Sequence, residues 1–90
     1  MIEKTVVIAN PLGIHARPAA LIVQRAAQFA AEITLSKGDV HNINGKSIMG
    51  VMMLAAESGA EVTITADGAD EEAALEAVAA LMQSNFEDKV

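Results

Sequence analysis

Hydrophobic and polar residues alternate in three segments of this 90-residue chain. The segments are residues 4–8, 32–36 and 61–66, and aliphatic residues such as Ile33 and Leu35 are separated there by polar ones. A period of two places the aliphatic side chains on one face of a strand. We therefore predict three strands, together with a weaker one over residues 40–43. The segment Lys37-Gly38-Asp39 is typical of a hairpin turn between the strands predicted over residues 32–36 and 40–43.

Three other segments follow the period of an α-helix. Residues 16–29 place their apolar side chains in one stripe, formed by Ala19, Ile22, Val23, Ala26 and Phe29. Residues 70–83 begin with acidic side chains, which the helix dipole favours in a first turn, and carry an apolar stripe at Leu75, Val78 and Met82. Residues 47–54 predict a shorter helix that Ser47 can cap.

The order of these elements indicates the fold class. A sheet with one apolar and one polar face is usually antiparallel, and helices cover its apolar face. We therefore predict an α+β fold in which a four-stranded antiparallel sheet carries three helices on one face, in the order βαββαβα. With no linker or repeat in 90 residues, the chain should form a single domain over residues 1–90.

Composition narrows the classes of function. The net charge of −6 opposes binding to nucleic acid. No apolar run approaches the roughly 18 residues that span a bilayer, and residues 1–6 lack the pattern of a signal peptide, so we expect a cytoplasmic protein without membrane insertion. With no cysteine, and with His15 and His41 far apart, we expect no metal site. The chain is also too short for a substrate domain plus a cofactor domain, so we do not expect a self-contained metabolic enzyme, and we expect no cofactor.

The candidate chemistry lies in Gly13-Ile14-His15-Ala16-Arg17-Pro18, at the start of the first predicted helix. A helix N-terminus presents unpaired N–H groups, here those of Ala16 and Arg17, and a partial positive charge, which together favour a phosphoryl group. The neutral imidazole of His15 is a nucleophile, and the guanidinium of Arg17 is a planar donor suited to phosphate. We predict that His15 carries a phosphoryl group. The alternatives are a capping or surface role for His15 and a solvated position for Arg17.

This segment resembles the active-site signature of HPr, the histidine-containing phosphocarrier family of the bacterial phosphotransferase system. The resemblance continues through residues 44–54, which are similar to the family's regulatory serine region, and through residues 58–71. It implies an open-faced β-sandwich and a phosphoryl carrier rather than an enzyme. It also implies that His15 accepts phosphate on Nδ1 from phosphorylated enzyme I and passes it to enzyme IIA domains in sugar uptake, assisted by Arg17.

The resemblance further implies that Ser47 is the site modified by the ATP-dependent HPr kinase/phosphorylase. Phosphate at a helix start is tolerated electrostatically, but its negative charge beside the histidine surface should weaken docking to an acidic partner. The alternative is that Ser47 is an ordinary helix cap.

A docking patch for the partner proteins is implied at six positions: Leu21, Gln24, Arg25, Ile48, Met49 and Met52. The short helix over residues 47–54 cannot bury every side, and methionine suits a surface that repacks against several partners. The alternative is that the residues of this helix pack in the core. Because such docking is transient, we expect a monomer.

Two other functions remain open from the sequence. One is a regulatory binding module on the same kind of fold, with His15 serving only as a cap. The other is a paralogue of the family, either from its nitrogen-related branch or used chiefly through Ser47. The pattern Lys46-Ser47-Ile48-Met49-Gly50 favours the sugar branch.

Overall fold

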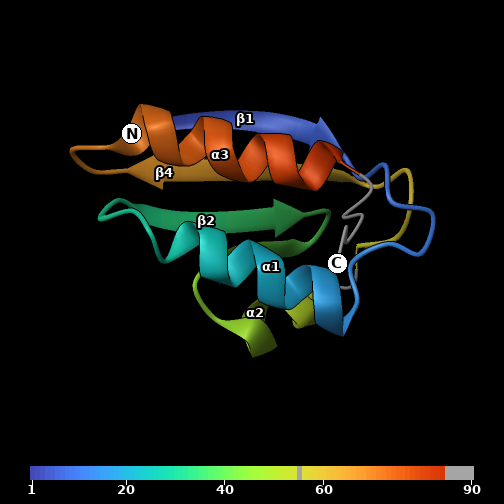
Figure 1. The fold of residues 1–90 in the computed structure, drawn as a ribbon. Helices are drawn as coiled ribbons and strands as arrows, with labels where there is room; N and C mark the ends of the chain where they lie inside the picture. The colour runs from blue at the N-terminus through green and yellow to red at the C-terminus, as the bar shows by residue number, and fades with distance from the viewer. Residues whose placement is uncertain (55, 85–90) are drawn as a thin grey trace.

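The computed structural model describes residues 1–54 and 56–84. Along the chain lie β1 (Ile2–Val7), α1 (Ala16–Ala26), β2 (Glu32–Lys37), β3 (Val40–Asn44), α2 (Ile48–Met53), β4 (Glu61–Asp67) and α3 (Glu71–Gln83). The strands form one four-stranded sheet in the order β1-β4-β2-β3, and all neighbouring strands are antiparallel (Figure 1). The predicted order βαββαβα and the antiparallel sheet are confirmed.

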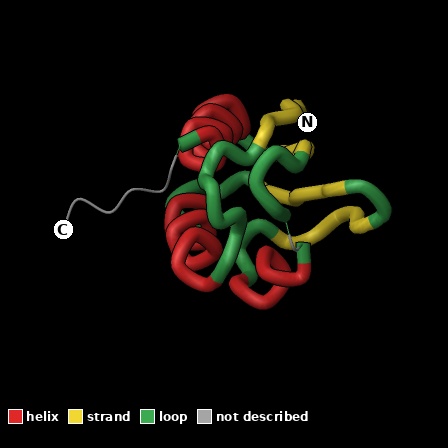
Figure 2. The backbone as a smooth tube through the Cα atoms, turned by 90° about the vertical axis from the view of Figure 1, so that its right-hand side faces the viewer, coloured by secondary structure: helices red, strands yellow, loops and turns green. Residues whose placement is uncertain are grey.

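The helices lie together on one side of the sheet, and its other face is open (Figure 2). Helix α3 packs on β1 and β4, while α1 lies between α3 and α2 and contacts both. The open face is polar, and the Oγ1 atoms of Thr5 on β1 and Thr63 on β4 lie 2.8 Å apart there. This arrangement is the open-faced sandwich that the family resemblance implied.

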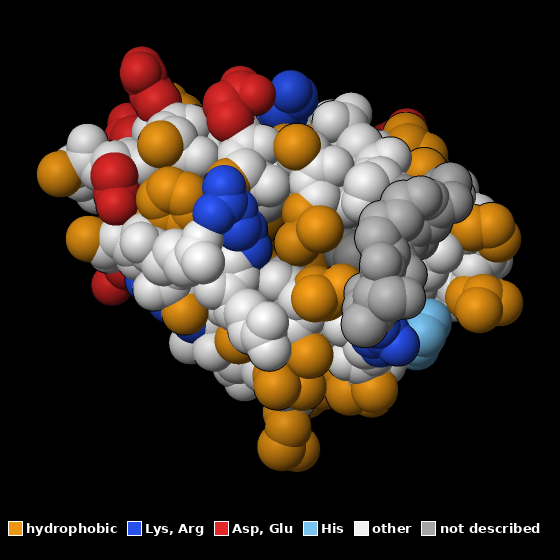
Figure 3. Space-filling model, in the orientation of Figure 1, with side chains coloured by type: hydrophobic (Ala, Val, Ile, Leu, Met, Phe, Trp, Pro, Cys, Tyr) orange, Lys and Arg blue, Asp and Glu red, His pale blue; other side chains and the backbone are white. Residues whose placement is uncertain are grey.

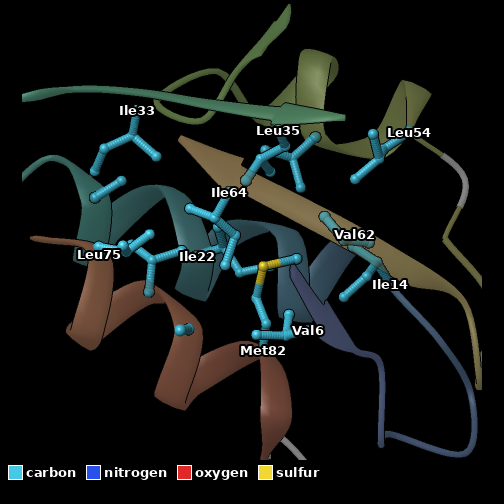
Figure 4. Close-up of a cluster of buried hydrophobic side chains, with 14 of the residues drawn as sticks. Val6, Ile14, Ile22, Ile33, Leu35, Leu54, Val62, Ile64, Leu75 and Met82 are labelled. Atoms are coloured by element: carbon cyan, nitrogen blue, oxygen red, sulfur yellow. The ribbon is translucent and has the colours of Figure 1, made fainter. Parts of the chain in front are cut away.

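The core fills the space between the sheet and the helices (Figure 4). Ile22 of α1 and Met82 of α3 point toward Val6 and Ile64 of the sheet, and none of these four side chains is more than 2% exposed. The apolar stripes predicted for the first and last helices therefore face the core. The other large, fully buried side chains are Ile8, Pro18, Ile33, Leu35, Val51, Leu54, Val62 and Val78.

The predicted element ends needed correction. Helix α1 ends at Ala26 rather than Phe29, because the Phe29 N–H donates to the Ala26 carbonyl at 3.1 Å and closes a tight last turn. Lys46 Nζ also donates to the Phe29 carbonyl, at 2.7 Å. Helices α2 and α3 each begin one residue later than predicted, because Ser47 and Asp70 occupy the N-cap positions.

The strands follow the alternation closely. Strand β1 begins two residues before the predicted start and ends at Val7, one residue before the predicted end. Ile8 lies just beyond the strand, and its N–H donates to the Ala60 carbonyl at 2.9 Å. Strands β2, β3 and β4 are each one residue longer than predicted. The predicted hairpin turn is confirmed at Gly38, whose φ of +57° is a conformation that glycine adopts without strain.

Asp70 ties the start of α3 to the loop between α1 and β2. Its carboxylate accepts the backbone N–H groups of Ala30 at 2.9 Å and Ala31 at 2.8 Å. The Ala30 N–H makes the largest contribution to holding the pKa of Asp70 below its usual value, and the Ala31 N–H and the nearby charge of Lys46 act in the same direction. This carboxylate thus joins two segments that are 40 residues apart in the chain.

Candidate functional site

The loop that leads to His15 is held by hydrogen bonds on two sides. Asn10, which is buried, donates from Nδ2 to the Gly13 carbonyl at 2.8 Å and accepts the Gly13 N–H on its own carbonyl at 2.9 Å. On the other side, the Ile14 N–H donates to the Ala56 carbonyl at 2.8 Å. The backbone next to His15 is therefore fixed from within the loop and from the segment before β4.

Gly13 allows this loop to approach its neighbour closely. Its φ is +73°, and a Cβ built at this position would lie 2.6 Å from the Ala56 carbonyl oxygen and 2.9 Å from the Glu57 Cα. Both of these are backbone atoms, which cannot rotate aside as a side-chain tip can. Glycine at position 13 is therefore required by backbone conformation and by space at once.

His15 occupies the N-cap position of α1 with an extended backbone, at φ −118° and ψ −164°. Its carbonyl accepts the Ala19 N–H at 2.9 Å, so the N–H groups ahead of Ala19 lie at the open end of the helix. The imidazole is exposed, and among the described residues it makes no capping hydrogen bond to this helix. His15 is thus at the cap position without its side chain acting as the cap, which removes the capping alternative.

The other residues of the first turn fit an anion. Ala16 and Arg17 are both exposed, and Pro18, which has no N–H to leave unpaired, is fully buried and anchors the turn. No acidic side chain lies in the first turn of α1. The structure therefore brings the imidazole of His15 and the cation of Arg17 to one positively polarised helix end.

Ser47 caps α2, as predicted. Its hydroxyl accepts the Gly50 N–H at 3.1 Å, and its carbonyl accepts the Val51 N–H at 2.9 Å. The side chain of Ser47 is half-buried, and that of the preceding residue, Lys46, extends to the Phe29 carbonyl in the turn that follows α1. The cap is a structural role that Ser47 has whether or not the residue is modified.

Helix α2 exposes most of its apolar side chains. Met49 is 76% exposed, Ile48 46% and Met52 43%, whereas Val51 is fully buried. The alternative prediction that Ile48, Met49 and Met52 pack in the core is therefore wrong. Met53 is 68% exposed as well, although the docking patch implied by the family resemblance did not include it.

The other half of the implied docking patch lies on α1, which packs against α2. Leu21 is half-buried, and Gln24 and Arg25 are exposed. The Arg25 guanidinium lies 5.4 Å from the centroid of the Phe29 ring and also donates a hydrogen bond to Gln28 Oε1. Hydrophobic side chains gather along the lower edge of the molecule, over α2, in Figure 3.

Sequence reasoning missed one further apolar side chain near the histidine. Leu12, in the loop just before α1, is 78% exposed. The signal was available, because a leucine in the turn after Asn10-Pro11 has no neighbour in a periodic apolar stripe. His41, the second histidine, lies elsewhere: it lines a shallow hollow at the open face of the sheet with Thr5 and Thr63.

Residues 1–54 and 56–84 contain no group of three or more histidine, cysteine, aspartate or glutamate side chains placed to hold a metal ion. None of the helices in that part of the chain combines the length and the apolar character needed to cross a membrane.

Comparisons with known proteins identify the family. A family model described as the PTS HPr component phosphorylation site matches residues 2–84. The phosphocarrier protein HPr of Treponema pallidum (strain Nichols) is 49% identical over 89 residues, which cover 99% of this chain and 100% of that protein.

Solved structures agree with this match. The crystal structure of HPr-C-His from Thermoanaerobacter tengcongensis has a TM-score of 0.89 and 43% identity, and the alignment covers 100% of both chains. A crystal structure of an HPr dimer from the same organism has a TM-score of 0.74 and 44% identity, covering 98% of this chain and 100% of that one. Sequence and fold match over nearly the whole length, and the chain therefore belongs to the HPr family of phosphocarrier proteins of the phosphotransferase system.

Proposed function

We propose that His15 is the residue that carries the phosphoryl group in this phosphocarrier, and that Arg17 and the start of α1 hold that group during transfer. Members of the HPr family are phosphocarriers rather than catalysts, and this chain is one of them. The observation that carries the proposal is the exposed imidazole at the start of α1: His15 lies at the N-cap position, and its side chain makes no capping hydrogen bond to the helix among the described residues.

The chemistry is an in-line transfer between histidines. The neutral Nδ1 of His15 attacks the phosphorus of phosphorylated enzyme I, and a new N–P bond forms as the bond to the donor nitrogen breaks. The Arg17 guanidinium and the N–H groups of Ala16 and Arg17 then face the phosphoryl oxygens and stabilise their negative charge. Transfer to an enzyme IIA domain repeats the step with His15 as donor. The protein is regenerated in each cycle.

The exposed surface of α1 and α2 supports docking of enzyme I and enzyme IIA domains at Leu21, Gln24, Arg25, Ile48, Met49 and Met52. Seven of the twelve acidic residues of the chain fall between Asp67 and Asp88, so the half that contains α1 and α2 is much less negative than the average. That distribution favours a partner with an acidic docking face. We further propose that the protein acts in the cytoplasm as a monomer. Because a relative from T. tengcongensis has been crystallised as a dimer, the molar mass of this protein in solution should be measured, and a dimer would contradict the proposal.

The test is phosphorylation of the purified protein by enzyme I, magnesium and phosphoenolpyruvate, followed by mass spectrometry under acid-free conditions that preserve phosphohistidine. The wild type and His41→Ala should gain one phosphoryl group, and His15→Ala should gain none. His41→Ala is the matched control because it removes the only other histidine, on a different face of the molecule. No adduct on the wild type with an active, compatible enzyme I would favour a binding module instead.

A second role is supported at Ser47, where we propose regulation by an HPr kinase/phosphorylase. The hydroxyl lies at the N-terminus of α2, next to exposed Ile48 and Met49, so a phosphate there would place negative charge on the docking surface. We expect Ser47→Asp to slow phosphorylation of His15 by enzyme I. Ala73→Asp, which adds the same charge at an exposed position of α3, is the control. Equal rates for Ser47→Asp and wild type would contradict the proposal.

A further inference from the structure

The five methionines of this chain divide into three environments. Met49, Met52 and Met53, on α2, are 76%, 43% and 68% exposed. Met82 is fully buried in the core, and Met1 is 79% exposed at the start of β1, on the side of the molecule away from α2 (Figures 1 and 2). Three accessible thioethers are thus concentrated within five residues, on the surface to which the partners are proposed to dock.

Exposed thioethers react with peroxides. The sulfur lone pair attacks one oxygen of hydrogen peroxide, and the O–O bond breaks. The oxygen bound to sulfur gives its proton to the departing hydroxide, so an S=O bond remains and water leaves. Sulfur loses two electrons and the peroxide gains them. The product, methionine sulfoxide, is polar and chiral where the thioether was apolar and flexible, and methionine sulfoxide reductases reverse the change.

The consequences for the fold and for docking differ. Met49 and Met53 extend mainly into solvent, and α2 is held by the Ser47 cap and by buried Val51 and Leu54, none of which contains sulfur. Oxidation should therefore leave the fold intact. A docked partner, in contrast, would have to strip water from each sulfoxide oxygen and enclose it in an apolar contact, which is unfavourable unless the partner supplies a hydrogen-bond donor.

We infer that Met49, Met52 and Met53 form an oxidation site at which peroxide reversibly weakens docking of the phosphotransfer partners, without altering His15 itself. The inference rests on the proposed function of the α1–α2 surface. It adds to that function a redox sensitivity that is located in α2 alone.

The experiment treats the purified protein with dilute hydrogen peroxide, locates the added oxygen by peptide mass spectrometry, and measures the rate of His15 phosphorylation at a limiting concentration of enzyme I. Added oxygen is expected on Met49, Met52 and Met53, and on exposed Met1, but not on buried Met82; the triple variant described below retains Met1 and so controls for its oxidation. The rate should fall by about tenfold or more. A methionine sulfoxide reductase should restore it, and circular dichroism should show an unchanged fold.

Two variants locate the effect. The first is the triple variant Met49→Leu/Met52→Leu/Met53→Leu, in which leucine side chains of similar volume, which peroxide does not oxidise, replace the thioethers of α2. The second is Met82→Leu, which changes the buried methionine and keeps the three methionines of α2. Each treated protein is compared with its own untreated sample, so differences in basal rate do not enter. Peroxide should slow Met82→Leu as it slows the wild type and leave the triple variant unaffected. Equal slowing of the triple variant, or an unchanged rate of the oxidised wild type, would overturn the inference. Failure of the untreated protein to become phosphorylated would instead overturn the proposed function and, with it, this regulation.

Discussion

Replacement of Gly13 by alanine tests whether close backbone contact fixes the loop that presents His15. The residue has φ +73°, a conformation that disfavours an L side chain by about 1–2 kcal/mol. The new Cβ would also lie 2.6 Å from the Ala56 carbonyl oxygen and 2.9 Å from the Glu57 Cα, so one backbone segment must move. Such overpacking destabilises by about 1–3 kcal/mol. The expected total is about 2–5 kcal/mol.

Gly38 provides a matched control for the steric contribution. It has a similar φ of +57°, but a Cβ there would meet nothing within 4 Å. Gly38→Ala should therefore lose only the conformational part, about 1–2 kcal/mol. The difference between the two variants isolates the contact of Gly13 with the segment before β4. Because native proteins have free energies of unfolding of about 5–15 kcal/mol, Gly38→Ala should remain folded, whereas Gly13→Ala loses a large part of its stability.

The assay is urea unfolding followed by far-ultraviolet circular dichroism, because the chain has no tryptophan or tyrosine to report by fluorescence. Gly13→Ala should also slow phosphorylation of His15 under conditions where it is fully folded, since the displaced segment adjoins the histidine, while Gly38→Ala should not. Equal destabilisation of the two variants would refute the steric argument. A normal phosphorylation rate in Gly13→Ala would refute the link between the loop contact and the placement of His15.

Two further predictions concern capping and pH. Ser47→Ala should lower the free energy of unfolding by about 1 kcal/mol, because the Gly50 N–H loses its cap; urea unfolding measures this, and an unchanged midpoint would contradict it. The carboxylate of Asp70 accepts the N–H groups of Ala30 and Ala31, and these hydrogen bonds lower the pKa of Asp70 in the folded protein. The carboxylate therefore stabilises the fold at pH values above the unfolded-state pKa. This stabilisation is lost as the pH falls through the lower pKa of the folded state. Wild type should therefore be more stable than Asp70→Asn near neutral pH, and the difference should shrink in acid; parallel pH profiles in urea unfolding would contradict this.

Most of the fold could be predicted because its signals are local. A period of two marks each strand, as in the buried pair Ile33 and Leu35, and a period near 3.6 marks the helix faces that meet the core. The end of α1 could not be predicted in this way. Residues up to Phe29 suit a helix, but beyond Ala26 the chain closes a tighter turn, and Lys46, which lies 17 residues further along the chain, binds the Phe29 carbonyl at the end of that turn. Asp70 acts similarly, since its side chain bonds a distant loop rather than capping its own helix.

The candidate site divides in the same way. The sequence predicted the helix start at His15 and the cap at Ser47, because both depend on residue types at fixed local spacing. It did not predict the close approach of Gly13 to the segment before β4, which depends on where that segment lies in the folded molecule. Exposure of Met53 was missed for a related reason: in a short apolar run, periodicity alone does not tell which side chains the rest of the fold leaves uncovered.

The two parts of the site meet different physical requirements. Phosphoryl transfer depends on a nucleophile held in a defined position, and His15 is attached to a loop that Asn10 and the Ala56 carbonyl fix through backbone hydrogen bonds. Docking to several partners requires a surface that adapts, and the exposed methionines of α2 have flexible side chains on a helix that the buried residues Val51 and Leu54 attach to the core. In the proposed function, separating the rigid nucleophile from the adaptable surface allows contacts on α2 to change from partner to partner while the geometry at the start of α1 stays the same. If partners dock on α2 as proposed, a modification there should alter partner binding and leave the chemistry of His15 intact.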